Sequence, residues 1–346
     1  MRACVMFATE TYALPILRPL AAAATARGLK VAWLVTDAVA QKLRHDETRL
    51  TSVQAVRAFA PDATFCAANW VPPGVPGLKV QVFHGFNANK REPDRGHFAI
   101  RGFFDLYTTQ GPATTLPFEA LAKEHGYFAV TETGWPKLDP LFSDAVDLYI
   151  PRDGRPLVLF ASTFSHRLSC APGMLEPLRE LIARGDRQWL LTLHPKSEPG
   201  LIRAYRELEA SNARYMDSEF LIDMQRAADV LVCDTSSVIH EFAVQGKPVV
   251  TVANRRPEPF MLDVASPEAV DAAIGVALSH PPALMAAIKA HGDDIHPYRD
   301  GLSSERVLDA AEAALAHRRA AHGRKPLNLV RRFKAWRDRR AVFPGG

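Results

Sequence analysis

The sequence predicts an α/β protein made of two successive doubly wound domains, and three observations support this. Short, continuously apolar runs recur along the chain, a pattern typical of strands buried on both faces of a parallel sheet. Segments with helical apolar spacing separate most of these runs, so the connections are right-handed β-α-β crossovers. The 346 residues exceed one ordinary core, and the 47% hydrophobic and 23% charged content is that of a globular protein.

The first domain is expected to span residues 1–145. Its predicted strands are 2–7, 29–35, 62–67 and 80–83, with two further strand ends near 106–109 and 131–134; helices are predicted at 14–27 and 116–125. The first strand is not followed by a Gly-x-Gly-x-x-Gly fingerprint, so a dinucleotide-binding interpretation has no support here.

A hinge is expected around Pro151, Gly154 and Pro156, and the second domain is predicted to span residues 146–320. The expected strands are 157–161, 189–193, 213–216, 229–233 and 249–252. The expected helices are 176–183, 199–209, 219–226, 238–244 and 266–279, followed by a long helix that ends near residue 322. Residues 321–346 are predicted to form a basic amphipathic helix and tail.

The turn after the predicted strand 229–233 carries Asp234, Thr235, Ser236 and Ser237 directly before a helix. Backbone N–H groups and hydroxyls at such a position bind phosphate at the carboxyl edge of a parallel sheet. The same residue types also cap ordinary helices, and caps are far commoner than anion sites. The turn alone therefore leaves both interpretations open.

Two histidines also follow predicted strands. His84 comes after 80–83 and precedes Gly85, and His194 comes after 189–193 and precedes Pro195. Imidazole titrates near neutrality, which suits proton transfer or phosphate stabilisation. The alternative is that each histidine only hydrogen-bonds to a neighbouring loop.

An ordered set of motifs resembles one family. The motifs are His84-Gly85 with Lys90, Thr133-Gly134-Trp135-Pro136-Lys137-Leu138-Asp139, Leu193-His194-Pro195, Asp229-Val230-Leu231 with Asp234-Thr235-Ser236-Ser237, Gly246-Lys247-Pro248, and Asp300-Gly301 with Ser304-Glu305-Arg306. Together they resemble the CDP-glycerol glycerophosphotransferases, polymerases and primases of teichoic acid and related capsular polymers, which have a GT-B-like fold with a cleft between two domains. The resemblance covers roughly residues 80–315. Trp135, Lys137 and Thr235 depart from the residues most common in that family.

The resemblance implies transfer of glycerol phosphate, or another polyol phosphate, from a CDP-activated donor to a hydroxyl of a lipid-linked or polymeric acceptor, with release of CMP. It implies His84 as the base and His194 as a phosphate-stabilising or acid group. Donor phosphates would be bound by Thr235, Ser236, Ser237, Ser303, Ser304 and Arg306, of which the last three equally fit a helix cap. Residues expected to line the donor or acceptor are Gly85, Lys90, Trp135, Pro136, Ser162, Thr163, Pro195, Lys196, Asp234 and Glu241. Asp234 is expected to orient the turn, and Glu241 either accepts from a donor hydroxyl or pairs with Lys247.

Other functions remain open at this point. A nucleotide-sugar glycosyltransferase or a UDP-N-acetylglucosamine 2-epimerase-like enzyme has the same architecture, and a non-catalytic nucleotide-binding protein is a further alternative. No tightly bound cofactor or metal is expected, although a diphosphate donor can bring Mg²⁺. The four cysteines are far apart and contain no CxxC pair, which predicts reduced structural thiols. No nucleic-acid partner is expected, and the oligomeric state is left open.

The segment 324–340, RKPLNLVRRFKAWRDRR, places apolar residues largely on one helical face among basic residues. This pattern indicates contact with an anionic membrane surface. The alternative is that the apolar face packs against the first domain as core. No apolar run reaches the length of a membrane span and no signal-peptide pattern is seen, so we expect a cytoplasmic protein that is peripheral on the inner membrane face.

Overall fold

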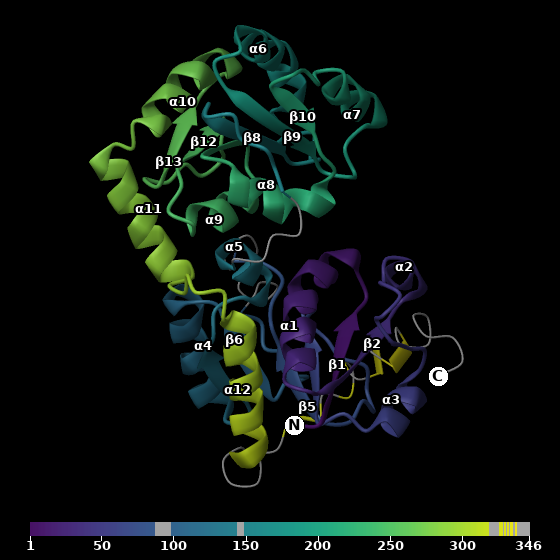
Figure 1. Cartoon of the computed structure of the whole chain (residues 1–346). Helices are drawn as coiled ribbons and strands as arrows, with labels where there is room; N and C mark the ends of the chain where they lie inside the picture. The colour runs from purple at the N-terminus through teal and green to yellow at the C-terminus, as the bar shows by residue number, and fades with distance from the viewer. Residues whose placement is uncertain are drawn as a thin grey trace. The chain divides into compact units, whose positions relative to one another are not determined.

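The structure is a computed structural model and describes residues 1–86, 98–143, 149–317, 325–327, 329, 331, 333, 334, 336 and 337. The chain forms two compact units (Figure 1). The first unit contains Met1–Asp139 and Ile295–Gly346, and the second contains Pro140–Asp294. Residues 295–317, expected in the second domain, group with the first unit instead, because the last long helix packs on elements of that unit.

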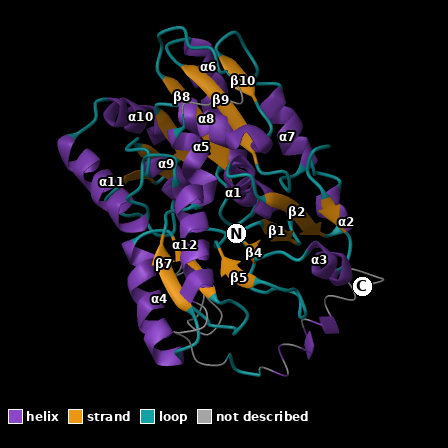
Figure 2. Ribbon diagram, turned by 60° about the horizontal axis from the view of Figure 1, so that its bottom comes forward, coloured by secondary structure: helices purple, strands orange, loops and turns teal. Residues whose placement is uncertain are grey.

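The first unit is built on a seven-stranded sheet in the order β3-β2-β1-β4-β5-β6-β7, in which every pairing is parallel. Its strands are β1 Ala3–Ala8, β2 Lys30–Val35, β3 Arg49–Leu50, β4 Ala63–Cys66, β5 Leu78–Gln81, β6 Leu106–Thr109 and β7 Ala129–Glu132. Its helices are α1 Leu14–Ala26, α2 Asp37–Ala40, α3 Val53–Phe59, α4 Pro112–His125 and α12 Ser303–His317. Helices flank both faces of the sheet (Figure 2). All residues of β1 and β4 are buried, as expected for central strands covered on both faces.

The second unit is built on a six-stranded parallel sheet in the order β10-β9-β8-β11-β12-β13. Its strands are β8 Leu157–Ser162, β9 Gln188–Leu193, β10 Ala213–Tyr215, β11 Val230–Cys233, β12 Val249–Val252 and β13 Met261–Val264. Its helices are α5 Asp139–Phe142, which begins at the unit boundary, α6 Ala171–Arg184, α7 Pro199–Arg206, α8 Leu221–Ala227, α9 Val238–Ala243, α10 Val270–Leu278 and α11 Pro282–Ile295. Two apolar clusters, one on each face of this sheet, form its core. The predicted α/β class with two doubly wound parallel sheets is confirmed.

Both sheets have a topological switch point, where the chain order of the strands reverses. In the second unit it lies between β8 and β11, and in the first unit between β1 and β4. In open α/β sheets, ligands bind outside the carboxyl ends of the strands at this point, because the two following loops diverge there. The topology therefore directs attention to the loops that follow these strands.

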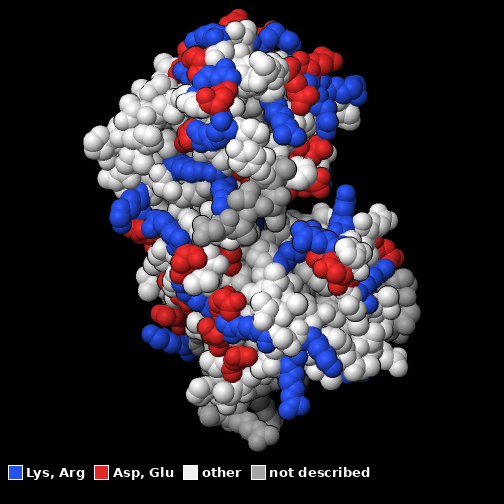
Figure 3. Space-filling model, in the orientation of Figure 1, with Lys and Arg blue, Asp and Glu red and all other residues white. Residues whose placement is uncertain are grey.

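No single helix in the described residues is long and apolar enough to cross a membrane; one sharply bent pair, Pro267–Leu278 with Pro282–Ile295, passes by length and composition alone. Basic and acidic side chains are interspersed over the face of the second unit seen in Figure 3. The four cysteines are free, and Cys4, Cys66 and Cys233 are buried.

Candidate functional site

Three strand ends of the second unit bring polar residues to one edge of its sheet. Ser162 ends β8 and Thr163 follows it, His194 follows β9, and the turn from Asp234 to Ser237 follows β11. These strands are neighbours in the parallel sheet, so their following loops lie at the same carboxyl edge. The switch point between β8 and β11 thus lies between the Ser162 loop and the serine-rich turn.

Asp234 fastens these two loops together. Its buried carboxylate accepts hydrogen bonds from Ser162 Oγ at 2.5 Å and from the backbone N–H groups of Thr163 and Cys170, both at 3.1 Å. Burial raises the pKa of Asp234, and the hydrogen bonds from Ser162, Thr163 and Cys170 oppose that rise. Asp234 is therefore a positioning residue that fixes the loop after β8 against the end of β11.

The hydroxyl-bearing turn lies at the protein surface. Thr235 and Ser236 are half-buried and Ser237 is exposed. Thr235 Oγ1 accepts from the backbone N–H of Arg255 at 3.1 Å, and Ser236 Oγ accepts a long hydrogen bond of 3.4 Å from the N–H of Val238. A hydroxyl that accepts one hydrogen bond still has its own proton to donate, so these groups remain able to bind an anion.

His194 has a defined tautomer in its neutral form. Its Nδ1 accepts from the backbone N–H of Lys196 at 3.0 Å, which places the proton on Nε2. Burial, and then the charge of Lys196, lower the pKa of His194, so the neutral form predominates at pH 7. The ring contacts that of Phe164, with 4.4 Å between centroids. His194 is thus arranged to donate a hydrogen bond through Nε2.

Pro195 and Lys196, both predicted to line the donor, are exposed directly after His194. Lys196 Nζ lies 5.8 Å from the centroid of the Phe164 ring, which places a positive charge beside the imidazole. Glu241, predicted to contact a donor hydroxyl, is buried in α9 and only 4% exposed.

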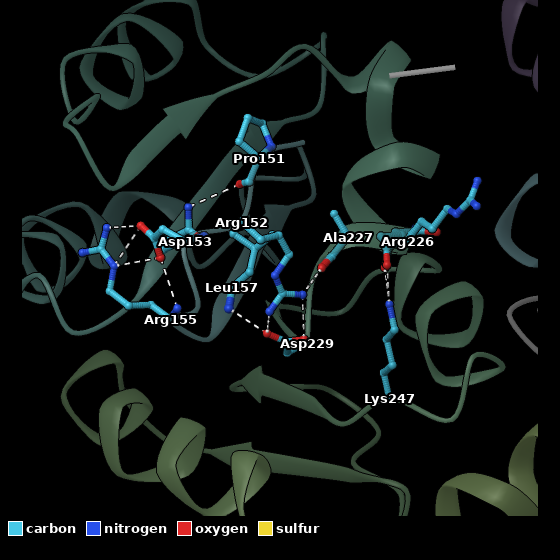
Figure 4. Close-up of polar contacts among 11 residues, drawn as sticks. Pro151, Arg152, Asp153, Arg155, Leu157, Arg226, Ala227, Asp229 and Lys247 are labelled. Carbon is cyan, nitrogen blue, oxygen red and sulfur yellow. Dashed lines mark hydrogen bonds and ion pairs between the residues drawn. The ribbon is translucent and has the colours of Figure 1, made fainter. Parts of the chain in front are cut away.

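Lys247 does not pair with Glu241, so that alternative is wrong. Its Nζ donates to the carbonyl oxygens of Gln225 and Arg226, at 3.1 and 2.6 Å, at the end of α8 (Figure 4). Beside it, Arg152 forms a salt bridge of 2.6 Å with Asp229. These residues precede β8, β11 and β12 and so lie at the amino edge of the sheet, opposite the serine-rich turn. Their role is to hold the second unit together.

His84 lies at the carboxyl edge of the first unit's sheet, beside its switch point. It is exposed, and its Nδ1 lies 3.2 Å from the carbonyl oxygen of Ala67, in the loop after β4. A carbonyl oxygen can only accept, so Nδ1 carries the proton and Nε2 carries the lone pair of the neutral ring. The Tyr12 ring, from the loop after β1, lies 5.7 Å away between centroids. His84 therefore has the tautomer that a general base at Nε2 requires.

The backbone on both sides of this contact is held by buried groups. Phe83, fully buried, has φ of 55°, a left-handed conformation unusual for an aromatic residue, and its ring packs against Phe118 at 5.1 Å between centroids. Cys66, also fully buried, lies with Sγ 3.4 Å from the carbonyl oxygen of Ala68 and 3.3 Å from that of Trp70. Buried side chains next to His84 and Ala67 thus hold in place the two segments that bring these residues together.

Gly85 and Lys90 follow His84 in the sequence motif. The carbonyl oxygen of Gly85 accepts from Gln110 Nε2 at 3.1 Å, so Gly85 contributes a backbone group that is already bonded within the protein. Lys90 lies outside the described residues.

Trp135 and Pro136, expected to line the donor or acceptor, are buried in the first unit, which corrects that prediction. Trp135 is 1% exposed; its ring packs against Phe86, with 5.0 Å between centroids, and its backbone N–H donates to His296 Nε2 at 3.0 Å. Burial lowers the pKa of His296 to about 4, consistent with a neutral acceptor. Gly134 is needed here because a Cβ atom would lie 2.5 Å from Ser303 Oγ.

Ser303, Ser304 and Arg306 were predicted to bind donor phosphate, and the structure gives each of them a partner within the first unit. The carboxylate of Asp139 occupies the N-terminus of α12, accepting from the N–H of Ser303 at 2.8 Å and of Ser304 at 2.7 Å. Both serines are buried. Arg306 pairs with Asp300 and stacks on Tyr298, with 4.2 Å between the guanidinium carbon and the ring centroid. A protein carboxylate therefore accepts from the two backbone N–H groups at the start of α12 that a phosphate would use.

Two exposed residues near these edges were missed by the sequence analysis. Tyr12 lies beside His84, and Arg255, after β12, is joined to Thr235 through its backbone. The polar run after the first strand could have indicated Tyr12, whereas the proximity of Arg255 depends on the pairing of β11 with β12. In the described part of the chain there is no group of three or more His, Cys, Asp or Glu side chains arranged to hold a metal ion.

Residues 108–256 match the family model described as CDP-Glycerol:Poly(glycerophosphate) glycerophosphotransferase. This match confirms the resemblance predicted from the motifs, and it includes β8, β9, β11 and the serine-rich turn. No curated protein sequence shows a significant match to the chain.

Solved structures share the fold across nearly the whole chain. The wall teichoic acid polymerase TagF aligns with a TM-score of 0.67 at 15% identity, covering 91% of this chain and 90% of the other. A putative UDP-N-acetylglucosamine 2-epimerase from Listeria monocytogenes aligns with a TM-score of 0.64 at 14% identity, covering 91% and 97%. MnaA of S. aureus, in a co-structure with UDP, aligns with a TM-score of 0.62 at 16% identity, covering 94% and 99%. At these identities the likeness establishes a common fold.

Proposed function

We propose that this chain, part of which matches a family of glycerophosphotransferases, transfers glycerol phosphate or a related polyol phosphate from a CDP-activated donor to an acceptor hydroxyl. The acceptor class that fits best is a lipid-linked or polymeric glycan. One TagF structure carries the description of a 30-minute soak with CDPG, which makes a CDP-activated donor a reasonable first choice for testing.

The observation that carries the proposal is the position of the serine-rich turn. It lies at the switch point of the second unit's sheet, inside the matched segment, with Thr235, Ser236 and Ser237 at the surface. A diphosphate bound there would meet the hydroxyl donors of the turn, and the basic residues Lys196 and Arg255 follow β9 and β12 at the same edge of the sheet.

The two histidines suit opposite roles in the reaction. The acceptor oxygen attacks the β-phosphorus, the bond from that phosphorus to the bridging oxygen breaks, and CMP leaves with the bridging oxygen. His84 Nε2, which bears the lone pair, takes the proton of the attacking hydroxyl. His194 Nε2–H donates to a phosphoryl oxygen and stabilises the charge that develops on it. The phosphate groups of the CDP-activated substrate would thus contact a neutral imidazole N–H, and the hydroxyl of the acceptor substrate would contact a base.

The test is CMP release from CDP-glycerol in the presence of glycerol phosphate oligomers or a lipid-linked acceptor. His84→Ala and His194→Ala should each lower kcat by on the order of 10² or more. Thermal unfolding should remain that of the wild type, since His84 is exposed and His194 lies at the edge of the sheet. Wild-type kcat in both variants would remove the assigned roles.

A panel of donors separates the alternatives. Release of UDP from a UDP-sugar would favour a glycosyltransferase, and interconversion of UDP-N-acetylglucosamine with its 2-epimer would favour an epimerase, whose fold is also similar. Donor binding in calorimetry with no turnover on any acceptor would favour a non-catalytic nucleotide-binding protein.

A further inference from the structure

The C-terminal tail presents apolar side chains to solvent instead of burying them. Leu327 and Leu329 are each 71% exposed and Phe333 is 64% exposed. The described residues from 329 to 337 are helical (Figure 2), and the Phe333 ring stacks with that of Trp336 at 5.7 Å between centroids. The interpretation of this face as core of the first unit is therefore wrong for these three side chains.

Basic side chains, in contrast, attach the tail to the protein. Lys325 Nζ donates to the carbonyl oxygen of Phe103 at 2.9 Å and pairs with Asp105 at 2.7 Å. Arg331 donates to the carbonyl oxygen of Ile100 at 3.0 Å. In an ordinary surface helix the apolar face packs inward and the charged face meets water. Here two charged residues hold the segment while Leu327, Leu329 and Phe333 face outward.

The charge of the segment indicates what covers these apolar side chains. Residues 324–340 contain eight Lys or Arg and one Asp. The whole chain has 42 basic and 38 acidic residues, so the acidic residues outnumber the basic ones in the remainder. Positive charge beside exposed Leu and Phe side chains is complementary to an anionic lipid bilayer, which has negative headgroups above apolar acyl chains.

We propose that the tail binds an anionic phospholipid membrane, with Leu327, Leu329 and Phe333 inserted among the lipids and Lys334 and Arg337 at the headgroups. Lys325 and Arg331 fix the tail to the loop of residues 98–105, so bound lipid would lie against the first unit. A lipid-linked acceptor would then be concentrated near the enzyme. That last consequence rests on the proposed function, whereas lipid binding itself does not.

The test is flotation of the full chain with vesicles of phosphatidylcholine alone and of phosphatidylcholine mixed with phosphatidylglycerol, in the absence of substrate. The wild type should float with the anionic vesicles, and less so as salt is added. Leu329→Ser/Phe333→Ser should bind at least about tenfold more weakly, because two apolar side chains no longer leave water. Leu116→Ser, at a leucine 67% exposed on α4, is the matched control and should bind like the wild type.

Charge is tested separately. Lys334→Gln/Arg337→Gln should weaken vesicle binding by about tenfold or more, while Lys123→Gln/Arg214→Gln, which removes two exposed basic residues elsewhere, should not. Equal flotation of the wild type and both tail variants would overturn the proposal. So would tail-dependent binding of a labelled single-stranded RNA without vesicle binding, or conversion of a dimer to a monomer by Leu329→Ser/Phe333→Ser. Because no donor or acceptor is present, failure here is distinct from failure of the proposed reaction.

Discussion

Two helices of this protein begin in similar sequence and differ in what occupies their N-terminus. Both α9 and α12 begin beside a pair of serines, and each pair has a buried aspartate nearby. Asp139 accepts from the amides of Ser303 and Ser304 in α12. Asp234 instead accepts from Ser162, Thr163 and Cys170, away from α9.

The direction of the aspartate separates a structural turn from a candidate binding turn. A carboxylate on the helix amides satisfies them and supplies the negative charge that the helix N-terminus attracts. A carboxylate that turns away stabilises the loop beneath and leaves the serine hydroxyls at the surface. Both places contain an aspartate and two serines, so only the three-dimensional structure distinguishes them.

The largest effect is expected at Asp234. Asp234→Ala should lower the free energy of unfolding by about 3 kcal/mol, because three buried donors lose their acceptor. It should also raise the donor KM, since the serine-rich turn is no longer fixed. Asp234→Asn keeps one acceptor oxygen and should recover part of both losses. Urea unfolding and donor titration measure the two effects, and unchanged stability in Asp234→Ala would contradict the role assigned to this carboxylate.

Asp139→Ala should affect stability alone. Loss of the acceptor at the N-terminus of α12 should lower the free energy of unfolding by about 2 kcal/mol. The donor KM of the folded protein should be unchanged, because the N-terminus of α12 stabilises the fold and does not bind the donor. If Asp139→Ala raised the donor KM and left stability unchanged, the N-terminus of α12 would be a phosphate site and the contrast drawn with α9 would be wrong.

The two serine pairs offer a sharper test. Ser236→Ala should raise the donor KM by about tenfold, the effect of one hydrogen bond to a charged group, with little change in stability. Ser303→Ala is the matched control and should leave the donor KM unchanged. If both variants raised the donor KM equally, the distinction between the two helices would fail.

The smallest effect is expected at the opposite, amino edge of the second unit's sheet. Burial lowers the pKa of Lys247 from 10.5 to about 8. The folded state then binds fewer protons than the unfolded state between these values, so the free energy of unfolding should rise with pH there, by about 1 kcal/mol over the first pH unit above 8. Below pH 8 the penalty for burying the charge is fully present and constant.

Lys247→Met should remove this pH dependence without changing the donor KM, as measured by urea unfolding across the alkaline range. A pH slope that persists in Lys247→Met would assign the titration to another group.

Much of the fold could be predicted because its signals are local. The buried runs at β8, β11 and β12 are almost entirely apolar, and Gly28 and Gly126 follow the ends of α1 and α4. The elements β3, β13, α2, α3, α5 and α11 were missed. Strand β3 has only two residues, and β13 has a mixed burial pattern at the sheet edge, so neither provides a clear period.

The candidate site was predicted less completely. His84, His194 and the turn from Asp234 to Ser237 follow strands, so the sequence placed them at sheet edges before any coordinates. Trp135, Ser303 and Ser304 belong to equally clear motifs, yet they are buried and bonded within the first unit. A motif shows that residue types are needed, and it does not show whether they bind a ligand or one another.

The sequence by itself determined the α/β class, the order of most strands and helices, the family resemblance and the basic character of the tail, because each depends on residues close together in the chain. Tertiary structure decided the strand order with its switch points, the return of residues 295–317 to the first unit, the tautomers of the two histidines and the direction of the two aspartates. Those features depend on hydrogen bonds between residues as far apart as Asp139 and Ser304, or His84 and Ala67. Local periodicity carries no information about such pairs, since the fold alone brings them together.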